Sequence, residues 1–421
     1  MRRIRVPAMA ALLVALVAAG PGSGTAATRF VQRTHVLWSV GGGQAGANFG
    51  WAVSELADID GDGVEDAIVS AVLEGDNMNG AVYVLSGATG DQLYEFHGDG
   101  GDLLGYSIAD AGDVDGDGVH DIAAGARSGN RAVVWSGATG DQLLELHGEQ
   151  PADAFGFSIA GVGDVDGDDH ADVLVGAVRN DTSAFDAGRA YVFSGADGSI
   201  VHALDAEHHA GDLFGSAADG IGDLDGDGVG DLLVGARNAT TSRDGRVYAF
   251  SGATGDRIWA TARDKTAKDL GWFFVSDVGD LNGDGTPDVY GGDFTYSVGG
   301  RNRGRVQIFS GVDGSVIREL FGSSANQGFG PGREAGDVDG DGVDDLIVGS
   351  YTSSDARKGA GKAEVFSGAT GDRLRLITST VEHENFGFDA IGLGDTNGDG
   401  RPDYLVSAST GNAVYLISGR G

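Results

Sequence analysis

The sequence predicts an all-β fold, a seven-bladed β-propeller of four-stranded antiparallel blades, and three observations support this prediction. An acidic loop recurs seven times along the chain. Each repeat contains short segments rich in β-branched and aromatic residues, which are typical of strands. The last repeat lacks its fourth strand, and an additional strand precedes the first repeat. Repeats of this size and strand content are typical of propellers.

The first acidic loop is "DIDGDGVED", residues 58–66. Carboxylates this close repel one another, so the turn is unfavourable unless a cation lies among them. Asp58, Asp60, Asp62 and Asp66 occupy loop positions 1, 3, 5 and 9, and the backbone carbonyl of Val64 falls at position 7. Oxygen ligands at this spacing favour calcium over magnesium or zinc.

Six further loops share this pattern, and successive loops begin 51 to 59 residues apart. None has the glutamate at position 12 that an EF-hand requires. We therefore expect up to seven structural calcium ions in loops that lead into strands. The ligands predicted in the six further loops, in order of position 1, 3, 5, 7 (carbonyl) and 9, are Asp113, Asp115, Asp117, Val119 and Asp121; Asp164, Asp166, Asp168, His170 and Asp172; Asp223, Asp225, Asp227, Val229 and Asp231; Asp280, Asn282, Asp284, Thr286 and Asp288; Asp337, Asp339, Asp341, Val343 and Asp345; Asp395, Asn397, Asp399, Arg401 and Asp403.

Residues 155–204 illustrate one repeat. The segments "FGFSIAGV", "ADVLVGAV", "RAYVFSG" and "SIVHAL" are bounded by glycine and aspartate, and each is predicted to be a strand. After the seventh loop only "PDYLVSAS" and "AVYLISG" follow, whereas "HVLWSVGG" (residues 35–42) precedes the first blade. We predict that this N-terminal strand completes the last blade and closes the ring, which removes an exposed sheet edge.

Composition limits the classes of partner. The formal net charge is −35, with 63 acidic and 28 basic residues, and the predicted loops explain much of it. A nucleic-acid partner is not expected, because it would require a basic face. The chain has no cysteine, and no second long apolar segment follows the N-terminal one.

Residues 1–27 are predicted to be a secretory signal peptide. They combine Arg2, Arg3 and Arg5 with an apolar run from Ala8 to Ala19 and a small-residue end. Residues 28–421 would then form the mature propeller domain. We expect a monomer of bacterial type that is secreted or periplasmic, with no transmembrane anchor in the mature chain.

Two short motifs flank the acidic loops. "FG" precedes the loop at Phe49, Phe155, Phe214 and Phe386, and "VGA" follows it at residues 175–177 and 234–236. With these motifs the chain resembles the FG-GAP repeats of integrin α-subunit propellers over about residues 35–420. The resemblance implies seven blades, calcium in the loops between strands 1 and 2, and extracellular recognition or adhesion. It also implies a ligand face built from the 2–3 and 4–1 connections.

The sequence departs from the family pattern at several places. All seven blades carry the loop, whereas integrins carry it in only some. Asp169 stands where the other loops have glycine, and Asn282 and Asn397 each remove one charge, so we expect weaker calcium binding in these three loops. Pro331 interrupts the first strand of blade 6, which should start late or lie irregularly.

The 2–3 connections of blades 3 to 6 are basic, and aromatic residues are interleaved with the basic ones. Arg189, Arg246, Arg305 and Lys362 recur at the start of strand 3, which favours a structural role. The remaining residues are candidates for an anion-recognising surface, since arginine pairs with carboxylate and sulfate groups. These candidates are Arg179, Phe185, Arg237, Arg243, Phe294, Tyr296, Arg301, Arg303, Tyr351, Arg357 and Lys358.

We expect a non-catalytic extracellular recognition or adhesion module whose unknown ligand is a glycan or a surface protein. No serine-elbow, zinc or phosphate-loop signature occurs. Two alternatives stay open: a polysaccharide lyase that uses a loop arginine or one of His208, His209 and His383, and a passive surface or matrix protein. The repeated turn "SGATGD", for example at Ser86, is assigned no chemistry.

Overall fold

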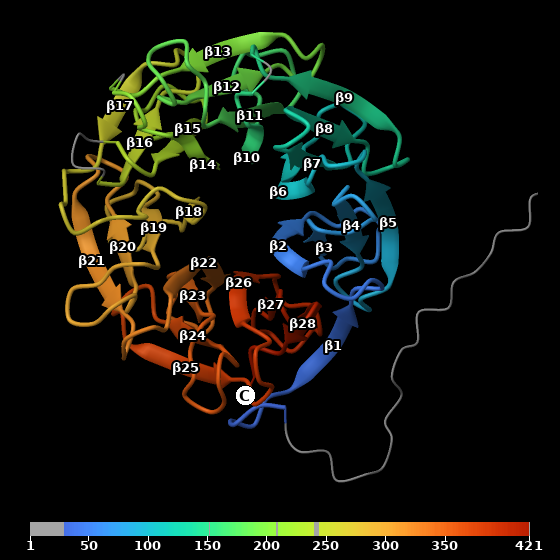
Figure 1. Ribbon diagram of the computed structural model, residues 1–421, viewed down its shortest axis with the longest axis vertical. Coiled ribbons are helices and arrows are strands. Elements are labelled where there is room, and N and C mark those ends of the chain that lie inside the picture. The colour runs from blue at the N-terminus through green and yellow to red at the C-terminus, as the bar shows by residue number, and fades with distance from the viewer. Residues whose placement is uncertain (1–28, 151, 208, 240–243, 421) are drawn as a thin grey trace, which may run out of the picture.

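The computed structural model describes residues 29–420 except 151, 208 and 240–243. These residues form seven antiparallel sheets of four strands each, arranged in a ring (Figure 1). No helix occurs among them, and hence none that is long and apolar enough to cross a membrane. The predicted fold class is confirmed, whereas the predicted signal peptide lies outside the described residues.

In blades 1 to 6 the four strands follow one another in sequence order from the axis outwards, and in blade 7 the N-terminal strand is outermost. Blades 1 to 3 are β2 (Phe49–Leu56), β3 (Asp66–Ala71), β4 (Ala81–Leu85), β5 (Gln92–His97); β6 (Leu104–Gly112), β7 (Asp121–Ala126), β8 (Arg131–Trp135), β9 (Gln142–His147); and β10 (Phe155–Gly163), β11 (Asp172–Ala177), β12 (Arg189–Phe193), β13 (Ile200–Leu204). Blades 4 to 6 are β14 (Phe214–Ile221), β15 (Asp231–Ala236), β16 (Arg246–Phe250), β17 (Arg257–Ala260); β18 (Val275–Asp277), β19 (Val289–Asp293), β20 (Arg305–Phe309), β21 (Val316–Phe321); and β22 (Phe329–Gly336), β23 (Asp345–Ser350), β24 (Lys362–Phe366), β25 (Arg373–Thr378). Blade 7 is β26 (Phe386–Gly392), β27 (Tyr404–Ala408), β28 (Ala413–Ile417) and β1 (Val36–Gly41).

The N-terminal strand closes the ring as predicted. β1 pairs antiparallel with β28, from Val36 opposite Ile417 to Gly41 opposite Ala413, and the two lie side by side in blue and red in Figure 1. Trp38 on β1 also donates its indole N–H to the carbonyl of Gly87 in blade 1, at 2.7 Å. The strand therefore joins the last blade to the first.

The "FG" and "GA" motifs meet where neighbouring blades pack. In the "VGA" of blade 3, a Cβ on Gly176 would lie 2.1 Å from the carbonyl oxygen of Gly215, the "FG" glycine of blade 4. Gly125 has the same relation to Gly156, again at 2.1 Å. The "FG" glycines also adopt positive φ, 84° at Gly215. Glycine is required on both sides because the two backbones approach too closely for a side chain.

Apolar side chains fill the spaces between adjacent sheets. Phe155 at the start of β10 packs against Tyr191 and Phe193 of its own blade, in a cluster that includes Ala123 and Val134 of blade 2. Phe155 is fully buried. Each phenylalanine of "FG" thus fixes the inner strand to the outer part of its own blade within an interface shared with a neighbour.

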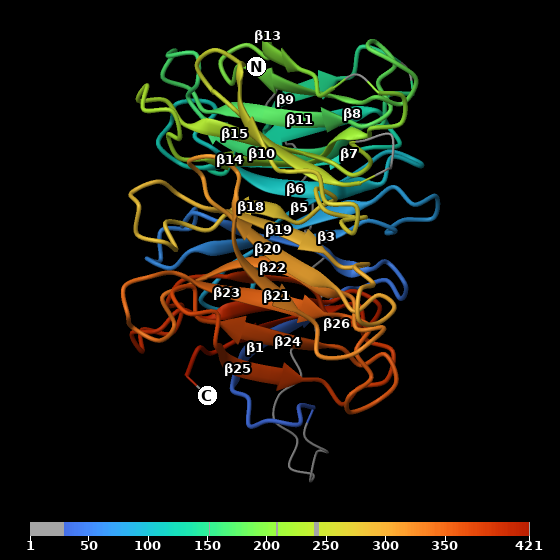
Figure 2. The same cartoon turned by 90° about the vertical axis from the view of Figure 1, so that its left-hand side faces the viewer.

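Connections alternate between the two faces of the disc, which Figure 2 shows edge-on. The acidic face carries the 1–2 loops and the 3–4 turns. The variable face carries the 2–3 and 4–1 connections, which hydrogen-bond each other: Leu103 N–H donates to Met78 O at 3.2 Å, and Gly211 N–H donates to Phe185 O at 2.8 Å. Any site built from these connections lies on the variable face.

Two local expectations can be compared with the structure. Asp169 adopts φ +68°, so aspartate occupies the left-handed conformation that glycine has in the other loops. The strand at Pro331 does not start late, because β22 begins at Phe329 as other inner strands begin at their phenylalanine. It is irregular instead, with φ of +146° at Gly330 and +135° at Gly332. Glycines on both sides of the proline absorb the distortion.

Candidate functional site

Each acidic loop is organised by its own backbone. In the first loop the N–H groups of Gly61 and Gly63 donate to the carboxylate of Asp58 at 2.7 and 2.8 Å. The same bonds recur in blade 3, where Gly167 and Asp169 donate to Asp164. In this geometry the position-1 aspartate is held at the centre of a tight turn. Hydrogen bonds to a carboxylate stabilise its charged form.

The aspartate at position 9 connects the loop to the 3–4 turn. Asp66 accepts one hydrogen bond from the N–H of Ile59 within the loop (3.0 Å) and another from the N–H of Gly87 (3.1 Å). The glycine of the repeated "SG" provides this second donor in every blade: Gly87, Gly137, Gly195, Gly252, Gly311, Gly368 and Gly419. The repeated turn therefore has a structural role that the sequence reasoning did not assign to it.

Burial makes the position-9 carboxylates costly to ionise. Asp66 and Asp121 are fully buried, and burial raises the pKa of each to about 6, although backbone hydrogen bonds partly oppose the rise. At the exposed position 1, hydrogen bonds from Gly228 and Gly226 lower the pKa of Asp223. A cation beside the position-9 group would offset its desolvation, because an opposite charge favours the ionised form.

The predicted ligands converge in the loops. Ligand oxygens of Asp58, Asp60 and Asp62 lie within 4.8 Å of one another in blade 1. Positions 1, 3 and 9 meet this criterion in blades 2, 3 and 4, for example at Asp113, Asp115 and Asp121, which could hold a metal ion. In blade 5 the side-chain amide of Asn282 donates a hydrogen bond to Asp288 at 3.1 Å. This bond partly stabilises the charge of the Asp288 carboxylate.

The basic residues at the start of strand 3 are structural, as predicted. Arg189 pairs with Asp205 at 2.6 Å, Arg246 with Glu207 at 2.6 Å, and Lys362 with Asp355 at 3.0 Å. Arg305 pairs with Asp264 at 2.8 Å and is only 3% exposed. The three arginines thus pair with carboxylates of 4–1 connections, and Lys362 pairs with one of the 2–3 connection of its own blade.

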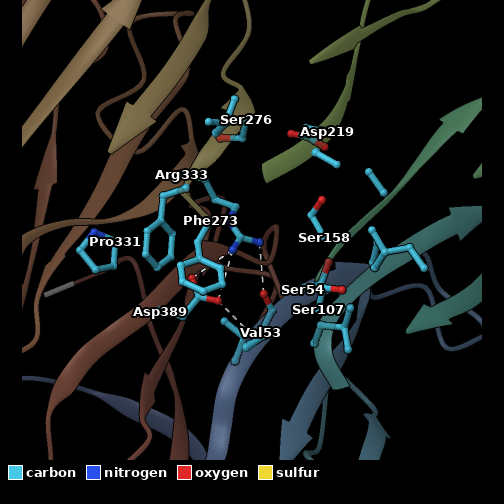
Figure 3. Close-up of a pocket in the computed structure, with 18 of the residues that line it drawn as sticks. Val53, Ser54, Ser107, Ser158, Asp219, Phe273, Ser276, Pro331, Arg333 and Asp389 are labelled. Atoms are coloured by element: carbon cyan, nitrogen blue, oxygen red, sulfur yellow. Dashed lines mark hydrogen bonds and ion pairs between the residues drawn. The ribbon is translucent and has the colours of Figure 1, made fainter. Parts of the chain in front are cut away.

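An axial cavity of about 410 Å³ lies among the inner strands (Figure 3). The inner strands run from the variable face to the acidic face, so residues near their starts line the end near the variable face. The third residues of four of these strands are aromatic and line this end: Trp51, Tyr106, Phe157 and Phe388. Serines follow at Ser54, Ser107, Ser158 and Ser276, and charged groups lie farther in. The cavity is thus apolar at one end and charged at the other.

Arg333 spans the charged end of the axial cavity. Its guanidinium donates to both carboxylate oxygens of Asp389, at 3.1 and 3.2 Å, and to the carbonyl of Val53 at 3.2 Å, as the dashed lines in Figure 3 show. Asp219 also lines this end, where burial and the nearby Asp277 and Glu55 raise its pKa to about 8. Arg333 therefore joins the inner strands of three neighbouring blades, 6, 7 and 1.

Phe273 projects into the aromatic end of the cavity. The segment from Leu270 to Asp280 in blade 5 is one residue longer than the equivalent segment from Phe155 to Asp164 in blade 3. Each segment runs from the residue before the first glycine of the repeat to the first position of the acidic loop. Phe273 has φ +66°, an unusual conformation for a bulky residue. Its ring centroid lies 5.4 Å from that of Phe157 and 5.9 Å from that of Tyr106. The extra residue thus carries an aromatic ring towards blades 2 and 3.

A second cavity, the basic cleft, opens beside the aromatic end over blades 2 to 4. It has a volume of about 580 Å³ and shares Tyr106, Phe157 and Trp272 with the axial cavity. Three arginines line it, Arg127, Arg179 and Arg237, against one acidic residue, Asp186. A cleft with this balance is notable in a chain of formal charge −35.

The three arginines differ in how they are held. The Arg127 guanidinium lies 4.3 Å from the ring centroid of Tyr106 and donates to its hydroxyl at 3.0 Å. Arg237 stacks on Trp272 at 3.4 Å and donates to Asp269 at 2.7 Å. Arg179 is exposed. Two cations are therefore fixed on aromatic platforms, and the third extends into solvent.

The structure separates the remaining candidates of the predicted ligand surface. Phe294 and Tyr351 line the axial cavity. Tyr296 is buried between Arg305 and Phe321, and Arg303 packs on Phe321. Phe185, Arg301, Arg357 and Lys358 are exposed and line neither cavity, and Arg243 lies outside the described residues. Of the arginine candidates that the structure describes, Arg179 and Arg237 line the same cavity.

Sequence reasoning missed Arg127 and the aromatic end of the cavity. Arg127 lies in a short, otherwise neutral 2–3 connection of blade 2, outside the basic segments. The aromatic residues could have been found from their shared place, since Trp51, Tyr106, Phe157 and Phe388 each follow the first glycine of their repeat. Among the histidines suggested as bases, His209 lies 3.5 Å from Asp212, and His208 falls outside the described residues.

Comparison with known proteins gives local similarity to one group. A model of the FG-GAP repeat matches residues 214–250 and 334–366. The chain is 37% identical to "Integrin alpha-PS2" of Drosophila melanogaster over 163 residues, 36% of this chain and 12% of that protein. It is 28% identical to "Integrin alpha-5" of Xenopus laevis over 241 residues, 52% of this chain and 22% of that protein. It is 32% identical to "Integrin alpha-V" of Gallus gallus over 163 residues, 36% of this chain and 16% of that protein.

The matched segments therefore cover less than a quarter of each of these integrin α-subunits. The similarity concerns the repeats, and the seven-bladed ring is the structure that such repeats build here. Matched repeats, local identity and architecture agree: the chain is an integrin-α-like FG-GAP β-propeller.

Proposed function

We propose that this protein is a secreted, calcium-stabilised recognition module that binds an acidic polysaccharide on its variable face. Calcium in the acidic loops holds the acidic face together, and the basic cleft takes the ligand. The similarity to integrin α-subunits supports an extracellular recognition role.

The observation that carries the proposal is the pairing of cations with aromatic rings in the basic cleft. Guanidinium groups bind carboxylates through charge-assisted, often bidentate hydrogen bonds. The rings of Trp272, Tyr106 and Phe157 line the same cleft and add apolar surface beside those cations. A glycan with one carboxylate per repeating unit offers both kinds of partner, an apolar sugar face and an anion.

Binding should be measured by affinity electrophoresis of residues 28–421 in calcium, through gels that contain hyaluronate or uncharged dextran. Hyaluronate should retard the protein and dextran should not. The variant Arg179→Glu should weaken retardation by at least about tenfold, since a hydrogen bond to a charged group contributes roughly 1.5–3 kcal/mol. The matched control is Arg301→Glu, which changes the charge equally at an exposed position outside the cleft lining and should bind nearly as the unmodified protein does.

Three outcomes would contradict the proposal. Equal weakening by Arg179→Glu and Arg301→Glu would indicate non-specific attraction. Unsaturated sugar products, detected by ultraviolet absorbance, would make the protein a lyase. Absence of retardation in any acidic gel would favour a passive structural role.

A further inference from the structure

Blade 1 differs from the other blades at the point where strand 3 begins. In blades 2 to 6 that position is basic, and in blade 1 it is Ala81, which is fully buried. The register fixes the equivalence: Ala81 lies opposite His97 on β5, just as Arg131 of blade 2 lies opposite His147 on β9. Blade 1 therefore lacks the cation of its neighbours.

The acidic partners of that cation are nevertheless retained in blade 1. Glu95 occupies the strand-4 position of Glu145 in blade 2, which lies 3.5 Å from Arg131. The equivalent Glu319 of blade 5 lies 3.1 Å from Arg305. Blade 7 also has alanine at the strand-3 position, Ala413, but Ser39 replaces the glutamate there. Only blade 1 combines the strand-4 glutamate with a missing cation among these four blades.

A second carboxylate in blade 1 increases the excess of negative charge at this place. Glu74, in the 2–3 connection, accepts a hydrogen bond from the hydroxyl of Tyr83 at its Oε1, at 2.7 Å. Its Oε2 is buried and has no hydrogen-bond partner among the described residues. An orphaned buried carboxylate oxygen is costly unless a cation meets it.

His97 completes a set of possible metal ligands. Ligand atoms of Glu74, Glu95 and His97 all lie within 4.8 Å of one another. The Nε2 of His97 lies 3.0 Å from Glu95, and its side chain is 56% exposed. We propose that these three residues bind one zinc ion, which takes the place of the missing strand-3 cation.

The donor set selects the metal. Two carboxylates and one imidazole suit a first-row divalent ion, whereas calcium prefers six to eight oxygen ligands. Zinc bonds of about 2.1 Å place tetrahedral ligands roughly 3.4 Å apart, so the cluster must contract slightly on binding. The exposed His97 can make that movement. Three protein ligands leave a fourth position open to solvent on the rim of the variable face.

The site should be tested on tag-free protein, residues 28–421, kept in excess calcium so that the acidic loops are saturated. Cobalt(II) serves as a visible probe, because tetrahedral coordination that includes histidine gives intense absorption, and zinc should displace it. We expect one equivalent to bind. His97→Ala and Glu74→Gln should each weaken zinc binding at least tenfold by calorimetry, because even indirect partners of a ligand contribute about that much.

Two further variants distinguish a metal site from a general effect of charge. His147→Ala removes the equivalent histidine of blade 2, where Arg131 is present, and should leave zinc binding unchanged. Ala81→Arg restores the residue type of the other blades and should abolish zinc binding while the thermal unfolding in calcium remains cooperative. Absence of a zinc equivalent in the unmodified protein, or equal losses in His97→Ala and His147→Ala, would overturn the proposal.

Discussion

Single residues explain why the repeat motifs have the form they have. The spacing of carboxylates from Asp58 to Asp66 could be interpreted from the sequence because ligand geometry is local. The hydrogen bond between Asp66 and Gly87 could not, because it depends on how the 3–4 turn folds back over the loop. Likewise, the glycines of "FG" and "GA" were recognised as a motif, but their contact between blades appears only when two blades are adjacent.

The inter-blade glycine contact gives a direct prediction at this scale. Gly176→Ala should destabilise the protein by about 1–3 kcal/mol, because the new Cβ would overlap the Gly215 carbonyl oxygen and force the blades apart. The control is Gly43→Ala, where a Cβ meets no atom within 4 Å and φ is not positive. That change should stay within about 0.5 kcal/mol. Denaturant unfolding in calcium measures both, and equal stabilities would refute the packing argument.

Elements were predictable where patterning repeats and less so where the chain deviates from the repeat. The four strands of residues 155–204 and the closing role of β1 followed from apolar patterning and from the incomplete last blade. Blade 5 has an extra residue before its loop, and blade 6 lacks one, counted from Phe329 to Asp337. These changes alter the segment that carries Phe273, just before β18, and the strand β22, which carries Arg333. The direction in which such an irregularity turns a side chain depends on packing around the axis, which local sequence does not specify.

The closing strand provides the prediction at the scale of elements. A chain that begins at residue 43 should melt at a markedly lower temperature than one that begins at residue 35. The shorter chain loses the ladder from Val36 to Gly41, leaves β28 as an exposed edge and removes the Trp38 bond to blade 1. Both chains lack residues 29–34, so calorimetry isolates the strand itself. Identical melting temperatures would contradict closure of the ring by β1.

The whole molecule divides its charge between two faces. The acidic face gathers the carboxylates of the seven loops, while the basic cleft lies on the variable face in a chain of formal charge −35. The acidic loops were predictable because each is a continuous segment of sequence. The cleft was predictable only in part: Arg179 and Arg237 were candidates, but Arg127 was not, and the three come from separate blades that meet only when neighbouring blades pack.

Structural calcium is the central claim of this account, and it is tested most directly by the thermal unfolding of residues 28–421 in 10 mM calcium and in chelator. Sites with dissociation constants of roughly 10⁻⁴–10⁻³ M would each contribute about 1.4–2.7 kcal/mol at that concentration. We predict a much lower melting temperature in chelator, because the repelling carboxylates then lack their counter-ions. The same melting temperature in calcium and in chelator would contradict the claim.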